Sequence, residues 1–209
     1  MPTDIQEQIE RRRERARAEI LKIANKGSHP VFSQFDVKSI SGRAYRVEIR
    51  SLDEMQNSCS CPDYKSNLIG TCKHIEAVLI HLREEHGEGL KKLAEKRPRG
   101  AQIYLHYGMD VTVRVTSPLP DRASARDLLD RYFDPAGLLV GSPLQILPAL
   151  MAAIESLPPR DRLLVSVAEA VREHLALLQD RDEIRQQKEW FLDQVTRGRR
   201  TFDVLSTKL

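Results

Sequence analysis

The sequence predicts an α+β fold organised as two regions in tandem, each with a β-hairpin followed by helices. Two segments alternate apolar and polar residues on either side of a glycine-containing turn, which is typical of a hairpin. Other segments repeat apolar residues every three or four positions, as amphipathic helices do. A charged stretch that leads into Pro98 and Gly100 separates the two hairpins and indicates a boundary. With 209 residues, 41% of them hydrophobic, the chain can build one large or two small domains.

Residues 1–30 are predicted to form an N-terminal helix. Thr3 or Asp4 would cap its start and Gly27 would end it. Its apolar residues are Ile5, Ile9, Ala16, Ile20 and Ile23. Its arginines are Arg11, Arg12, Arg13, Arg15 and Arg17. Because Glu10 and Glu14 are interleaved with them, we interpret the arginines as a solvated helix face, with nucleic-acid contact as the alternative.

Residues 31–97 form the next predicted unit, which begins with a hairpin around Ser41-Gly42. The apolar positions of its strands are Val37, Ile40, Tyr45, Val47 and Ile49. They alternate with the polar positions Lys38, Arg46, Glu48 and Arg50. Further along, Ile75, Val78, Leu79 and Leu82 follow the i, i+3, i+4, i+7 spacing of an amphipathic helix. The unit is therefore predicted to contain two strands and a helix.

Residues 98–196 are predicted to form a mixed domain with a hairpin and several helices. Its hairpin joins two alternating runs, residues 103–107 and 111–115, through Gly108-Met109-Asp110. Helices are expected at 124–133 and 143–157, and a short strand at 163–165. Residues 167–195 form either one long helix or two shorter ones, because Asp180-Arg181-Asp182 interrupts the apolar stripe. Trp190 and Phe191 are expected to pack the last helix, or alternatively to form a partner surface.

Residues 197–209 are predicted to be a linker toward a further domain downstream. Gly198 would end the preceding helix, and the apolar residues after it have little sequence left to bury them. These residues are Phe202, Val204, Leu205 and Leu209. The alternative is that this tail folds back as an edge strand on the second hairpin.

The composition excludes several classes of protein. No run approaches the roughly 18 apolar residues of a membrane-spanning helix, and the charged start lacks the apolar core of a signal peptide. The 33 basic and 30 acidic side chains leave a net charge of only +3, so bulk charge does not indicate nucleic-acid binding. The three cysteines form an odd, tight cluster that suits a metal in a reducing compartment better than disulfides. We therefore expect a cytoplasmic protein, nucleoid-associated if bacterial, with no membrane contact.

The cysteines carry the strongest functional signal. Cys59-Ser60-Cys61, a gap of ten residues, and then Cys72-Lys73-His74 supply three thiolates and one imidazole, which tetrahedral Zn²⁺ prefers. Pro62 fixes the exit of the chain from the first pair. Because all four ligands come from the protein, the pattern predicts one structural Zn²⁺ rather than a catalytic one. The alternative is three buried thiols beside an unrelated histidine.

These residues resemble a known family. The hairpin of residues 35–50, the run Cys59-Ser-Cys-Pro-Asp-Tyr64 and the run Gly70-Thr-Cys-Lys-His-Ile75 together look like a SWIM zinc finger, over roughly residues 31–86. The resemblance implies a zinc-stabilised ββα module with roles in DNA binding and protein contacts. Such modules occur in bacterial Swi/Snf-type helicases, Mutator-class transposases, recombination adaptors and ubiquitin ligases.

A weaker resemblance concerns the host protein. Residues 128–139 and the ending Thr201–Leu209 are similar to the segment that precedes the motor in bacterial Swi/Snf-type helicases. The resemblance implies a helicase motor further along the same polypeptide. This chain has no Gly-x-x-x-x-Gly-Lys-Ser/Thr run and no other familiar catalytic motif, so we expect the segment itself not to be an enzyme, whereas the full-length protein would be an ATPase or helicase.

Two functions remain open at this point. The first is an accessory region that makes weak, sequence-independent DNA contacts, protein contacts, or both. The basic residues near the zinc motif would make the DNA contacts: Lys65, Lys73, Arg83, Lys91, Lys92, Lys96 and Arg97. Glu84, Glu85 and Glu88 offset their charge, so an ordinary solvated helix end fits as well. The second function is a protein-interaction adaptor in which zinc is purely structural.

Overall fold

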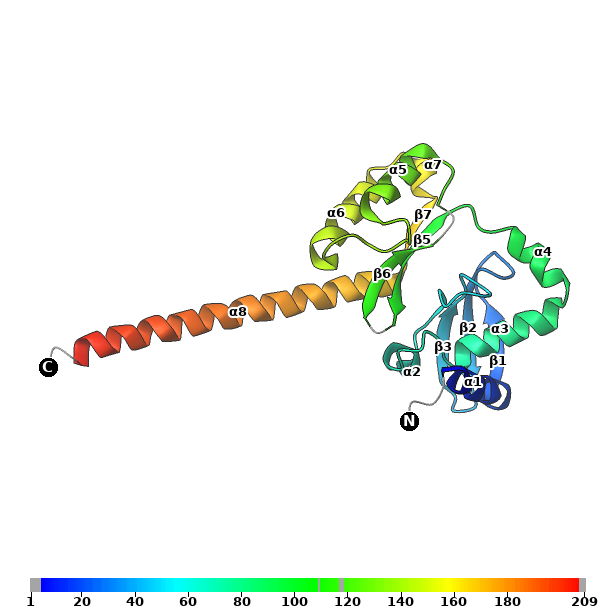
Figure 1. Cartoon of the computed structure of the whole chain (residues 1–209), viewed down its shortest axis with the longest axis horizontal. Helices are drawn as coiled ribbons and strands as arrows, with labels where there is room; N and C mark the ends of the chain where they lie inside the picture. Colours follow the sequence, from blue (N-terminus) through cyan, green and yellow to red (C-terminus); the bar gives the residue numbers. More distant parts are fainter. Residues whose placement is uncertain (1–4, 109, 117–118, 207–209) are drawn as a thin grey trace.

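Two β-sheets, each with helices packed against it, form the body of the molecule, and one long helix projects from it (Figure 1). The computed structural model describes residues 5–108, 110–116 and 119–206. The buried apolar residues form two clusters, one drawn from residues 31–90 and the other from residues 101–175. The boundary expected near residue 97 therefore lies between the two cores. The combination of sheets and helices confirms the α+β prediction.

The first sheet is antiparallel in the order β1-β2-β3-β4. Its strands are β1 (Ile20–Asn25), β2 (Gln34–Ser39), β3 (Ala44–Glu48) and β4 (Ser58–Cys59). The predicted hairpin is confirmed as β2 and β3, which pair with Val37 opposite Tyr45. Its apolar side is buried, as Phe35, Val37 and Val47 show.

The expectation of a single helix up to Gly27 is wrong. Helix α1 (Ile5–Glu19) ends earlier, and the chain continues as β1. Ile20 and Ile23 continue the helical spacing of α1, but β1 pairs with β2 with Ile23 opposite Val37. This pairing satisfies backbone groups along β2 that would otherwise be exposed. Residues 3 and 4, where the cap was expected, lie outside the described residues.

Three helices complete the first body: α2 (Pro62–Ser66), α3 (Lys73–His86) and α4 (Gly89–Glu95). The predicted helix after His74 is confirmed as α3, which buries Ile75, Val78 and Leu82. The sequence analysis missed α4 because its lysines resemble a charged linker. Leu90 is buried in the first core and anchors α4 to it.

The second sheet has the order β6-β5-β7. Strands β5 (Ala101–Tyr107) and β6 (Val111–Val115) are the predicted second hairpin, whose turn residue Met109 lies outside the described residues. Strand β7 (Val165–Val167) pairs in parallel with β5. The short strand expected at 163–165 starts later because α7 (Pro159–Arg162) comes immediately before it, with Leu163 as its C-cap. The predicted helices are confirmed as α5 (Ala123–Tyr132) and α6 (Pro143–Glu155).

Helix α8 (Glu169–Ser206) is a single helix of 38 residues that extends away from both sheets (Figure 1). Asp180-Arg181-Asp182 therefore does not divide it. Gly198 does not end it, and the alternative of an edge strand is wrong because residues 198–206 are helical. Trp190 and Phe191 do not pack on the body: they are 65% and 61% exposed. Among the described residues, no helix has the length and apolarity needed to cross a bilayer.

Candidate metal centre

The two halves of the cysteine motif meet between the first sheet and α3. Cys59 belongs to β4, Cys61 is the N-cap of α2, and Cys72 is the N-cap of α3. Their sulfur atoms and a ring nitrogen of His74 all lie within 4.8 Å of one another, and all four residues are buried. His74 Nδ1 lies 3.8 Å from Cys59 Sγ and 3.9 Å from Cys72 Sγ. Such separations suit the corners of a tetrahedron around one Zn²⁺.

The backbone between the two pairs brings them together. Pro62 starts the short helix α2, where a missing N–H costs nothing, and Tyr64 N donates to Cys61 Sγ at 3.4 Å. Gly70 then adopts a φ of +82°, a left-handed conformation that favours glycine. A Cβ at Gly70 would also lie 3.2 Å from Met55 Sδ. Glycine therefore suits the turn that delivers Cys72 to the site.

Without a metal, the three thiols differ in how readily they ionise. Hydrogen bonds from the Cys59 and Cys72 thiols lower the pKa of Cys61 far below its ordinary value. The hydrogen bond with Cys61 raises the pKa of Cys59, and burial raises that of Cys72. A single buried pocket without a metal thus favours one thiolate over three. A divalent cation supplies the positive charge that allows all three sulfurs to ionise.

This geometry, the Cys-x-Cys and Cys-x-His pairs and the strand–helix framework coincide with a known family. Residues 45–83 match the family model of the SWIM zinc finger. The match runs from β3 into α3 and includes all four metal ligands. No curated protein and no solved structure matches the chain. The SWIM zinc finger with its Cys59, Cys61, Cys72 and His74 cluster confirms the expectation of one zinc ion.

The basic residues proposed for DNA contact do not form one continuous patch. Lys65 is exposed on α2, whereas Lys73 at the start of α3 forms an ion pair with Glu19. Arg83 lies near the other end of α3, ten residues and therefore about 15 Å from Lys73. The remaining four follow on α4 and after it: Lys91, Lys92, Lys96 and Arg97. The guanidinium of Arg97 lies 5.0 Å from the centre of the Phe32 ring.

Several arginines of α1 are also not a purely solvated face. Arg12 donates to Asp63 Oδ1 at 3.2 Å, and Arg13 donates to Glu76 Oε2 at 3.0 Å. Glu76 is buried and also accepts a hydrogen bond from Thr71 Oγ1 at 2.6 Å. These contacts fasten α1 to the SWIM zinc finger, next to the metal ligands.

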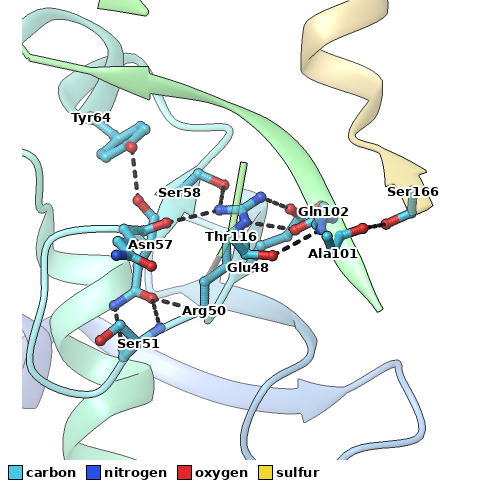
Figure 2. A network of polar contacts seen from close by, with 11 residues as sticks. Glu48, Arg50, Ser51, Asn57, Ser58, Tyr64, Ala101, Gln102, Thr116 and Ser166 are labelled. Atoms are coloured by element: carbon cyan, nitrogen blue, oxygen red, sulfur yellow. Dashed lines mark hydrogen bonds and ion pairs between the residues drawn. The ribbon is translucent and has the colours of Figure 1, made fainter. Parts of the chain in front are cut away.

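A buried arginine connects the SWIM zinc finger to the second sheet (Figure 2). The Arg50 side chain is only 4% exposed, although its place in the strand alternation suggests a solvent-facing position. Its Nη1 donates to Ser58 Oγ at 2.9 Å, next to the ligand Cys59, and its Nε donates to Gln102 Oε1 on β5 at 2.6 Å. Nη2 pairs with Glu48, and the guanidinium lies 4.4 Å from the Tyr104 ring centre.

The neighbouring loop is held by the same network. Asn57 Oδ1 accepts hydrogen bonds from the backbone N–H groups of Arg50 at 2.8 Å and Ser51 at 3.0 Å. Tyr64 donates its hydroxyl to Asn57 O at 2.8 Å (Figure 2). The rings of Tyr64 and of Tyr107 from β5 also meet edge to face, with 5.4 Å between ring centres. Nothing in the local sequence pattern indicates these long-range contacts, so sequence analysis could not find them.

Proposed function

We propose that this chain is a non-catalytic accessory region of a Swi/Snf-type DNA-dependent ATPase, and that its SWIM zinc finger makes weak, sequence-independent contacts with the DNA backbone. The closed metal site carries this proposal. With four buried protein donors, the zinc ion has no open coordination position for chemistry. Its contribution is therefore to fix the surface around it, and that surface is the part of the module available to a partner.

The charges on that surface support DNA as a partner. Lys65, Arg83, Lys91 and Lys92 are exposed, and their side chains have no hydrogen-bond or ion-pair partner among the described residues. Unpaired cations can neutralise phosphates and release counterions, which supplies most of the free energy of non-specific binding. Because these cations are scattered and the net charge is only +3, we expect weak binding.

Binding of a labelled duplex, followed by fluorescence anisotropy at several salt concentrations, tests this proposal. We expect dissociation constants in the range of about 1–100 μM near physiological salt, and a steep gain of affinity as the salt concentration falls to about 50 mM. Charge neutralisation of Lys91 and Lys92 should weaken binding, whereas neutralisation of Glu88 should strengthen it. Absence of binding at about 10 μM duplex and low salt would favour the adaptor function instead.

The motor itself is proposed to lie elsewhere in the same polypeptide. Because the chain has no phosphate-binding glycine loop, we expect it not to hydrolyse ATP, with or without DNA. Phosphate release measured beside a mock preparation tests this expectation. A rate above that of the mock preparation would contradict it.

A protein-interaction adaptor is the second candidate, and α8 is the observation that favours it. Among the side chains of α8 that the structure describes, six large apolar ones are exposed: Leu177, Ile184, Trp190, Phe191, Leu192 and Val195. An exposed apolar surface of this kind is typical of a protein contact. The salt dependence described above separates the two functions, because an adaptor without phosphate contacts has no steep salt slope.

A further inference from the structure

A hollow of about 370 Å³ lies directly beside the zinc ligands. Cys61 and His74 form part of its wall, together with residues from the end of β2, the β2–β3 turn and α1. Three cationic side chains line it: Arg15, Arg43 and Lys73. Three hydroxyl side chains line it as well: Ser39, Ser41 and Tyr45. This combination of cations and hydroxyl donors is suited to an oxyanion.

Arg43 is the cation that is available in this wall. Arg15 and Lys73 both bind the carboxylate of Glu19, with Arg15 Nε at 2.8 Å from Glu19 Oε1. The Arg43 side chain is exposed and has no hydrogen bond or ion pair with any residue that the structure describes. Arg43 immediately precedes β3 and lines the hollow together with Tyr45 on that strand. Arg46 points to the other side of β3 from Tyr45 and lines a different hollow.

His74 provides an independent sign of a missing partner. Its Nδ1 faces the thiols, so Nε2 is the ring nitrogen that remains for another partner. When Nδ1 binds a metal, Nε2 carries a proton and acts as a donor. Histidine ligands almost always donate this N–H to an oxygen atom. Here Nε2 is buried and has no hydrogen-bond partner among the described residues.

The charge around the hollow remains positive after its negative groups are considered. Asp63 lines the hollow but pairs with Arg12, and Glu19 is shared by Arg15 and Lys73. Zinc with three thiolates carries one net negative charge. Arg15 and Lys73 together with Glu19 contribute one net positive charge, and Arg43 contributes another, so the sum is positive. The start of α3, whose N-cap Cys72 makes no side-chain cap hydrogen bond, adds the partial positive charge of a helix N-terminus.

We propose that this hollow binds a phosphate oxyanion, and that its source is a phosphodiester of the DNA backbone. The inference rests on the proposed function and locates a phosphate contact at the edge of the zinc centre. Arg43 provides the outer, forked pair of donors and Lys73 a point charge. His74 Nε2–H donates to a phosphate oxygen at the floor, directly or through a bridging water.

Two variants with opposite expected effects on duplex affinity test the site in the zinc-loaded chain. Arg43→Gln should weaken duplex binding about tenfold at about 50 mM salt and reduce the salt slope by about one counterion. Glu19→Gln should strengthen binding by a similar factor, because it frees Arg15 and Lys73. Arg46→Gln and Glu14→Gln are the matched controls: each changes the same charge on a neighbouring surface outside the hollow. Zinc content and melting temperature should be recorded for all four variants.

A second arm distinguishes the sources of phosphate. Inorganic phosphate added to the labelled chain should shift the amide resonances of Ser41, Arg43 and Lys73, and the duplex should compete for the same residues. Shifts with phosphate that the duplex does not affect would assign the site to free phosphate and overturn the DNA source.

The possible failures are distinguishable. Equal duplex affinity for Arg43→Gln and Arg46→Gln, with no amide shifts in the hollow, would overturn the site but leave the proposed DNA contact standing. Absence of duplex binding by the unmodified chain would overturn the proposed DNA contact itself.

Discussion

Charged side chains that are buried, rather than exposed, connect the parts of this molecule. Arg50 joins the SWIM zinc finger to β5, Glu76 joins α1 to α3, and Asp161 joins α5 to α7. Each has at least two polar partners, as a buried charge requires. In the sequence these residues are not distinguishable from the many solvated charges around them. Their roles depend on partners that lie up to 63 positions away in the sequence.

Removal of Arg50 should destabilise the protein strongly. We expect Arg50→Met to lower the free energy of unfolding by about 3–5 kcal/mol, because it leaves Glu48 without its buried cation. Arg46→Met, four residues earlier on β3 and exposed, should change it by no more than about 0.5 kcal/mol. Urea unfolding of the zinc-loaded proteins at neutral pH measures both values. Similar losses for the two variants would show that Arg50 does not hold the junction.

Asp161 should stabilise the second domain in a pH-dependent manner. Hydrogen bonds from Ser124 and Arg122 lower the pKa of this carboxyl group below its ordinary value. A group with a lowered pKa in the folded state contributes its full stability above the unfolded pKa of about 4 and loses it as the pH falls further. Asp161→Asn should therefore speed amide exchange in β5 and β7 near neutral pH, and this difference should shrink below about pH 4.

Asp121→Asn is the control for this prediction, because Asp121 is fully exposed and lies 3.7 Å from Arg126. It should leave exchange in β5 and β7 unchanged at every pH. An effect of Asp161→Asn that does not depend on pH would contradict the electrostatic explanation.

At the level of elements, the sequence predicts those whose periodicity is set by one buried face. Both hairpins, α3, α5 and α6 are of this kind, and so is the metal site, because its four ligands form two short local pairs. Strand β1 could not be predicted in the same way. Its Ile20 and Ile23 fit the helical spacing of α1, and only the pairing with β2 makes them a strand. Tertiary pairing overrides local preference there.

The far half of α8 should be the least protected regular element of the chain. Residues 183–197 are all exposed, so their helix lacks the tertiary packing that stabilises most helices. We expect the amides of residues 185–197 to exchange far faster than those of residues 103–107 in β5. Trypsin should cleave first at Arg185 or Lys188. Slow exchange across residues 185–197 would show that another molecule, or a second copy of the chain, covers this face.

The part of the chain that the structure describes has two hydrophobic cores but one zinc site. The zinc ligands belong to the first core, whereas the second core is assembled from β5, β6, β7 and the helices around them. The two cores meet at Arg50–Gln102 and at Tyr64–Tyr107. Removal of zinc should therefore unfold one core and only weaken the other.

Chelation and Cys72→Ser test this division. A structural zinc site supplies on the order of 10–16 kcal/mol, which is comparable to the whole stability of a small domain. We expect one zinc per chain by metal analysis, and we expect its removal to abolish amide protection in β2, β3 and α3. Protection in β5 and α6 should persist, with a lower melting temperature because the contacts of Arg50 and Tyr64 are lost.

Zinc added back should restore the chelated protein but not Cys72→Ser, since three remaining donors leave the tetrahedron incomplete. This difference separates loss of the metal from any direct effect of the chelator. Continued protection of β2 and β3 in the zinc-free chain would mean that the first core folds by its apolar contacts alone. Loss of β5 protection at the same chelator concentration would instead mean that the junction makes both cores one cooperative unit.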